Sequence, residues 1–156
     1  MKTVRLTLPL PPSVNNQYAT VGKRRVLSRE ARRFRRSVAA IVRDGFSAGR
    51  IHQGWIDTAR GEPLACDITF YFTTPYRRDL DGGLKIALDA LLDALDLDDR
   101  YVVSITLTKQ IDPLEPRAEI ELAPITSWQF DETYVVLDQP DGSEPDVGEG
   151  DSRDTD

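Results

Sequence analysis

The chain has 156 residues, a formal net charge of −6 at pH 7 and a hydrophobic fraction of 40%. This length predicts one domain that buries a core without covalent cross-links. One cysteine and one histidine exclude a disulfide framework, a thiolate zinc site and histidine-rich metal chemistry, so oxygen atoms would have to hold any metal ion. No apolar run approaches the ~20 residues of a membrane helix. A lone cysteine fits a reducing compartment, and we expect a cytoplasmic protein.

Charge is distributed unevenly along the chain. Residues 1–50 hold 12 Lys and Arg against 2 Asp and Glu, residues 51–130 hold 7 against 14, and residues 131–156 hold 1 against 10. A basic first third on an acidic protein favours a polyanionic partner.

The first third of the chain predicts a strand, a loop and a helix. Residues 3–8 alternate in polarity as a strand does, and prolines at 9, 11 and 12 end the strand. Residues 13–25 predict a loop. Ser28 is the expected N-cap of a helix that buries an apolar stripe including Phe34 and Val38.

The remaining elements complete the predicted order β-α-β-α-β-β. Residues 45–63 predict an irregular connection, 64–73 a strand, 80–95 a leucine-faced helix, and 101–109 and 117–123 two further strands. This order predicts an α/β fold with a mixed β-sheet covered by two helices.

Domain boundaries follow from the same pattern. We expect one domain over residues 1–124 and an extension over 125–137 that could dock on it through its aromatic residues. Residues 138–156, rich in acidic residues, Gly, Ser and Pro, predict an acidic disordered tail.

Two carboxylates stand where the second strand gives way to the long helix. Asp79 and Asp81 follow Arg77 and Arg78, and Lys85 comes four residues after Asp81. The alternative interpretation is structural, because acids at a helix start stabilise the helix dipole and Asp81–Lys85 has the spacing of an intrahelical pair.

Three more acids, Asp96, Asp98 and Asp99, crowd the turn that leaves this helix. Gathered carboxylates repel one another, and Mg²⁺ is a natural counterion because it prefers carboxylate and water oxygens. Two such ions ~3.5–4 Å apart could clamp the attacking and leaving oxygens of a phosphodiester displacement, with Lys85 serving the phosphate charge or orienting the water. A solvated turn is the alternative for the three acids.

Basic residues are concentrated between positions 23 and 36, where eight of fourteen residues are Lys or Arg. Such a surface binds phosphates with an affinity that falls steeply with salt. A solvated helix face is the alternative, but only Glu30 and Asp44 are nearby to balance it. The expected DNA-binding residues are Lys23, Arg24, Arg25, Arg29, Arg32, Arg33, Arg36, Arg77 and Arg78.

From Thr3 to Leu122 the sequence resembles the RusA family of Holliday junction resolvases. The resemblance is carried by a strand followed by Pro-Pro-Ser and two asparagines, by Arg78-Asp79-Leu80-Asp81 with Lys85, and by Asp98-Asp99 before two valines. It implies metal-binding aspartates at Asp79, Asp81 and Asp99 and a catalytic lysine at Lys85.

The resemblance also implies a homodimer that places paired symmetric nicks in a four-way DNA junction, in recombination and repair. The implied cofactor is Mg²⁺, with Mn²⁺ as the alternative, and the family is common in prophages. The domain over residues 1–124 would then be a RusA-like endonuclease domain.

One departure from the family leaves other functions open. Gly82 and Gly83 follow Asp81, where the family commonly has asparagine, and two glycines weaken a first helical turn. A catalytically inactive protein that binds branched DNA is therefore the alternative function, and a magnesium nuclease acting on RNA or flaps is a third.

Overall fold

The computed structural model describes residues 3–76 and 78–127. Its elements in chain order are β1 (Val4–Pro9), η1 (Val14–Asn16), β2 (Tyr18–Val21), β3 (Arg24–Leu27), α1 (Arg29–Ser47), α2 (Gln53–Ala59), β4 (Leu64–Phe72), α3 (Leu84–Leu95), η2 (Asp99–Tyr101), β5 (Val102–Ile111) and β6 (Arg117–Pro124). No helix in these residues is long and apolar enough to cross a bilayer.

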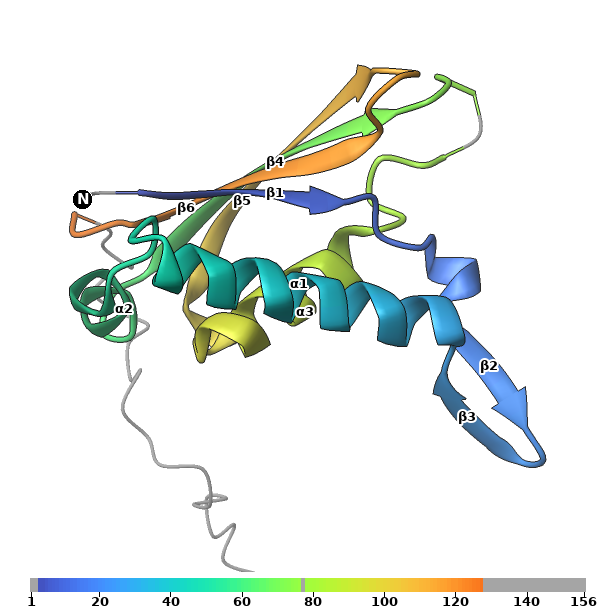
Figure 1. Cartoon of the computed structure of the whole chain (residues 1–156), viewed down its shortest axis with the longest axis horizontal. Helices are drawn as coiled ribbons and strands as arrows, with labels where there is room; N and C mark the ends of the chain where they lie inside the picture. Colours follow the sequence, from blue (N-terminus) through green and yellow to red (C-terminus); the bar gives the residue numbers. More distant parts are fainter. Residues whose placement is uncertain (1–2, 77, 128–156) are drawn as a thin grey trace, which may run out of the picture.

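A four-stranded sheet in the order β1-β6-β4-β5 confirms the predicted mixed α/β fold (Figure 1). β4 and β5 are parallel neighbours joined through α3, and the other pairs are antiparallel. Side chains of β4 alternate between buried and more exposed, as they do when one face of a sheet is covered. α1 and α3 lie on that face (Figure 1), and α1 begins after Ser28, whose hydroxyl accepts the Ala31 N–H at 3.0 Å, as predicted.

The described residues form three α-helices rather than two, and a hairpin where a loop was expected. α2 lies in the predicted irregular connection and buries Trp55, Ile56 and Ala59. β2 and β3 pair across Gly22, whose positive φ of 62° permits a tight turn. The hairpin projects from the body beyond the start of α1 (Figure 1).

α3 begins at Leu84, four residues later than predicted. Residues 80–83 form turns instead, with the Gly82 N–H donating to the Asp79 carbonyl at 3.2 Å. A Cβ on Gly83 would lie 2.4 Å from Cγ of Pro11, so only glycine permits this approach of the two loops. Asp79 and Asp81 therefore precede the helix and are not part of its first turn.

The described residues include only the start of the predicted C-terminal extension. The Ile125 N–H donates to the Pro63 carbonyl at 2.7 Å, so the expected extension starts against the beginning of β4. Residues 128–137 of that extension, the acidic tail over 138–156 and Arg77 lie outside the described residues.

Candidate active site

Lys85 lies on the first turn of α3 and points into an open pocket with Asp99. Leu92 and Leu97 form its apolar part, and its charged lining comes from α1, α3 and the start of η2: Arg35, Lys85, Asp89, Asp93, Asp98 and Asp99. The Lys85 Nζ lies 3.1 Å from Oδ2 of Asp89 and donates a hydrogen bond to Oδ1 of the same carboxylate at 3.3 Å. This hydrogen bond and the negative charges of Asp89 and Asp99 raise the pKa of Lys85, so the pocket holds a protonated lysine at neutral pH.

The acids that follow α3 have separate structural environments. Asp96 ends the helix in a left-handed conformation, with φ 55°, and pairs with Arg60. Asp98 caps η2 by accepting the Arg100 N–H at 2.9 Å, and its contacts with Arg100 lower its pKa. Asp99 is the exposed acid whose charge acts on Lys85. The structure thus places Asp99 and Lys85 in the lining of one pocket.

Asp79 and Asp81 lie on the turn before α3, with both side chains exposed. The Asp81 carbonyl accepts the Leu84 N–H at 3.0 Å, which anchors the turn to the helix. The intrahelical pair considered for Asp81 and Lys85 is absent, because Asp81 lies outside the helix and Lys85 pairs with Asp89 instead.

The donor atoms at these positions suit a hard divalent cation, although they form no ready-made cage. Within residues 3–76 and 78–127, no three Asp, Glu, His or Cys side chains are grouped so that they could hold a metal ion. Mg²⁺ commonly uses one or two carboxylates and completes its shell with water and phosphate oxygens. Asp99 shares a pocket with Lys85 and fits that mode of binding, whereas Asp79 and Asp81 do not line that pocket.

Two residues to which the sequence analysis assigned no role support this site. Gln17 is a buried polar residue, 3% exposed, whose amide donates to the Gly82 carbonyl at 3.5 Å and so connects the N-terminal loop to the aspartate turn. Asp89 lies between Lys85 and Arg35, whose Nη2 is 4.0 Å from the same carboxylate. The helical spacing of Lys85 and Asp89, four residues apart, was the available signal for the second residue.

Arg35 differs from its basic neighbours because it faces inward. It is half-buried and donates to Asp93 at 3.1 Å, whereas the expected DNA-binding residues of α1 are exposed: Arg29, Arg32, Arg33 and Arg36. Arg35 thus connects α1 to α3, while its neighbours present a cationic surface.

The hairpin continues this cationic surface. Lys23, Arg24 and Arg25 are exposed on it, and the Arg25 guanidinium stacks 4.2 Å from the ring of Tyr18. Tyr18 also contributes electrostatically to the raised pKa of Lys85. The base of the hairpin therefore lies near the pocket.

Arg78 is partly buried beside the aspartate turn. It donates to the Pro11 carbonyl, its guanidinium lies 5.4 Å from the Phe72 ring centre, and burial lowers its pKa. Lys109 supports the same loop by donating to the Pro75 and Arg78 carbonyls at 2.8 and 2.9 Å.

The amino-acid sequence is similar to those of known proteins. Residues 9–123 match the family described as endodeoxyribonuclease RusA. The chain is 32% identical over 123 residues to the crossover junction endodeoxyribonuclease RusA of Escherichia coli strain K12, an alignment that covers 78% of this chain and 93% of that protein. Proteins of the same name from Enterobacteria phage 82 and Shigella sonnei strain Ss046 are similar to the same extent.

Proposed function

Because the chain belongs to the endodeoxyribonuclease RusA family, we propose that it is a structure-selective endodeoxyribonuclease that resolves four-way DNA junctions by paired nicks. The observation that carries this proposal is the pocket holding Lys85 and Asp99 beside the cationic surface of α1 and the hairpin. That surface would bind phosphates, and the pocket would supply the charge for cleavage.

Lys85 acts as a cation in this proposal. Because its pKa is raised, Lys85 stays protonated at neutral pH and is available to neutralise charge that develops on the cleaved phosphate. Asp89 holds the ammonium group in place through the 3.1 Å contact, and Arg35 holds Asp89 from the other side.

Asp79, Asp81 and Asp99 are the proposed ligands of Mg²⁺, or alternatively Mn²⁺. A bound divalent cation would polarise the phosphodiester and favour the attacking hydroxide. The turn stabilised by the Gly82 N–H and the amide of Gln17 would orient the first two carboxylates, and η2 would present the third.

We propose that the protein acts as a homodimer. A four-way junction has approximate two-fold symmetry, which an isologous dimer would match with two identical sites. The outer strand β5 supports this assembly, because Ile105 and Ile111 on it are 41% and 43% exposed and no described strand pairs with its outer edge. A second copy would cover this apolar edge.

The setting we propose is DNA recombination and repair in the cytoplasm of a bacterium carrying a prophage. The relative from Enterobacteria phage 82 supports the phage connection. The relatives from that phage and from Escherichia coli strain K12 are both named crossover junction endodeoxyribonucleases.

A synthetic four-way junction tests the function. With Mg²⁺, the wild type is expected to introduce paired nicks in the junction and to leave linear duplex uncut. Asp79→Asn and Asp81→Asn should bind the junction and fail to cut it, whereas Asp67→Asn on the uncovered face of the sheet should cut normally. If both active-site variants cut at the wild-type rate, the site assignment is wrong.

An inactive protein that binds branched DNA is the second candidate, favoured by Gly82 and Gly83 in place of the family's asparagine. It predicts junction binding without cleavage in either Mg²⁺ or Mn²⁺. Inclusion of flap and RNA substrates in the same assay tests the third candidate.

A further inference from the structure

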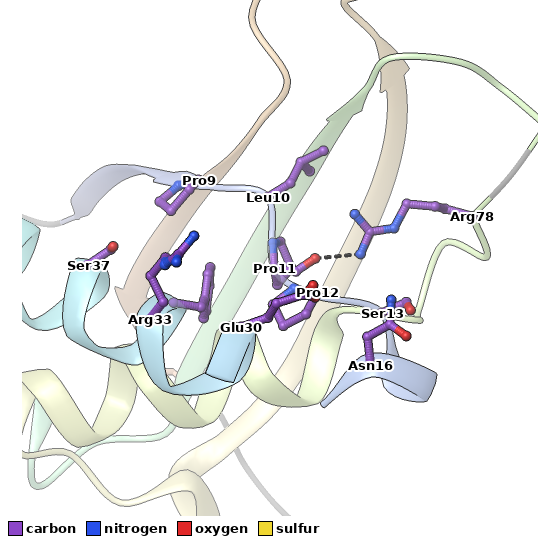
Figure 2. A pocket seen from close by; sticks show the side chains of 11 residues that line it. Pro9, Leu10, Pro11, Pro12, Ser13, Asn16, Glu30, Arg33, Ser37 and Arg78 are labelled. Carbon is purple, nitrogen blue, oxygen red and sulfur yellow. Dashed lines mark hydrogen bonds between the residues drawn. The ribbon is translucent and has the colours of Figure 1, made fainter. Parts of the chain in front are cut away.

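A second pocket, which we call the proline pocket, lies against the N-terminal loop. It has a volume of about 540 Å³, within the range of ~300–1,000 Å³ typical of small-ligand sites. Its lining residues are Pro9, Leu10, Pro11, Pro12, Ser13, Asn16, Glu30, Arg33, Phe34, Ser37 and Arg78. Figure 2 shows these residues arising from the loop after β1, from one face of α1 and from the loop before α3.

The walls of the proline pocket are held in shape by the fold. Three prolines fix the backbone of the first wall, and Gly83 packs against Pro11 so closely that a Cβ would lie 2.4 Å from its ring. Phe34 is 4% exposed and anchors the α1 wall in the core. A pocket with fixed walls binds a ligand without the entropic cost of ordering them.

Two arginines converge on this pocket without a carboxylate partner. Within the described part of the chain, Arg33 makes neither an ion pair nor a hydrogen bond, and Arg78 donates only to the Pro11 carbonyl. In Figure 2 the two guanidinium groups approach the Leu10–Pro11 segment from its two sides. Unpaired guanidinium groups of this kind are suited to phosphate groups.

The remaining lining of the proline pocket suits the rest of a nucleotide. Leu10, Pro11 and Phe34 supply apolar surface for a sugar or base. The side chains of Ser13, Asn16 and Glu30 provide hydrogen-bonding groups, and a carboxylate such as Glu30 accepts from base N–H groups. A phosphate on the surface of a duplex would contact only the two arginines. It would make no contact with this apolar lining.

We propose that the proline pocket binds one unstacked nucleotide of the DNA strand, with its two flanking phosphates on Arg33 and Arg78. This inference rests on the proposed function, because the crossing point of a four-way junction offers nucleotides whose stacking is interrupted. Extruding a nucleotide costs its stacking and pairing energy, so interrupted stacking lowers that cost. Arg78 directly precedes Asp79, so an occupied pocket would fix the strand next to the proposed site of cleavage.

Nucleotide binding without metal tests the inference on the full chain. In EDTA, NMR titration should show thymidine 3′,5′-bisphosphate binding most tightly, with a dissociation constant on the order of 1 mM or below. Thymidine 5′-monophosphate should bind more weakly, and thymidine and inorganic phosphate weakest. Equal affinity for inorganic phosphate and the bisphosphate would show an anion site only and would overturn the inference, as would a lack of binding.

Variants locate the binding in the pocket. Arg33→Gln removes one cation and Ser37→Phe fills the pocket without changing charge, and each should weaken bisphosphate binding about tenfold. Arg43→Gln removes the same charge from an exposed position of α1 outside the pocket and should change the affinity less than twofold. If the pocket variants bind like Arg43→Gln while retaining the wild-type unfolding midpoint, the inference is wrong.

The junction assay separates this inference from the proposed function. Junction cleavage without nucleotide binding would overturn the proline pocket alone. Nucleotide binding by a protein that cuts no junction would support the pocket and overturn the proposed function.

Discussion

Lys85 illustrates how single residues determine the chemistry of this site. The sequence placed it one turn from Asp81, but the structure pairs it with Asp89 and brings it near Asp99. Its positive charge is therefore stabilised by Asp89 and Asp99 and not by Asp81. A protonated lysine excludes a role as general base and favours charge neutralisation.

Asp89→Asn should reduce the rate of junction cleavage roughly 10- to 100-fold and leave junction binding nearly unchanged. Without the Asp89 charge, the pKa of Lys85 falls, so the activity should decline at a lower alkaline pH than in the wild type. The measurement is a pH profile of single-turnover cleavage. Asp93→Asn, which removes a contact of Arg35 but leaves the Lys85 pair, should keep the wild-type profile, and matching profiles for both variants would contradict the positioning role.

Cys66 gives a pH dependence of stability. Burial raises the pKa of its thiol to about 12, while the unfolded chain titrates near 9.0. Above that lower pKa only the unfolded state loses the proton, so this residue should reduce the free energy of unfolding by about 1.4 kcal/mol per pH unit between the two values. Urea unfolding at pH 8 to 10 should show a shallower decline for Cys66→Ala, and an unchanged slope would contradict the assignment.

At the scale of elements, strong periodicity made part of the fold predictable. The alternating strands β1, β4, β5 and β6 and the capped, amphipathic α1 lie within a few residues of their expected positions. α2 was missed because seven residues are too few to establish a helical period, and its burial depends on Trp55 packing in the core. The hairpin was missed because its strands bury almost nothing.

The candidate site was predictable as a set of residue types but not as a set of contacts. Asp79, Asp81, Lys85 and Asp99 stand out by spacing and by family resemblance. Gln17 and Arg35 are far from them in sequence, so their supporting role depends on the packing of α1 and the N-terminal loop. The late start of α3 likewise depends on a tertiary contact between Gly83 and Pro11.

Gly83→Ala tests that contact. The added Cβ would lie 2.4 Å from Pro11 Cγ, and a proline ring yields little, so the variant should lose about 1–3 kcal/mol of stability. At Gly82 the nearest atom to an added Cβ is the Asp79 carbonyl oxygen at 3.4 Å, so Gly82→Ala should stay within about 0.5 kcal/mol of the wild type. Chemical denaturation measures both, and equal losses would show that the loop approach is not what requires Gly83.

At the scale of the whole molecule, paired and unpaired cations lie on different surfaces. The uncovered face of the sheet carries arginines that are already paired, Arg5 with Glu121 and Arg117 with Asp112 and Glu119. The hairpin, by contrast, presents Lys23, Arg24 and Arg25 with no acidic partner among the described residues. Phosphate binding is therefore expected on the side of the hairpin and α1, despite the net charge of −6.

The salt dependence of junction binding tests this orientation. Replacing Lys23, Arg24 and Arg25 together by Gln should reduce the slope of log K against log salt concentration by about 0.9 for each phosphate that the variant no longer neutralises, or up to about 2.7 in total. A matched triple replacement of Arg5, Arg43 and Arg50 by Gln removes the same charge away from the hairpin and should change the slope by less than about 0.9. Binding is measured in EDTA so that cleavage does not intervene. Equal slopes for the two triple variants would show that net charge, and not the hairpin, governs the approach of DNA.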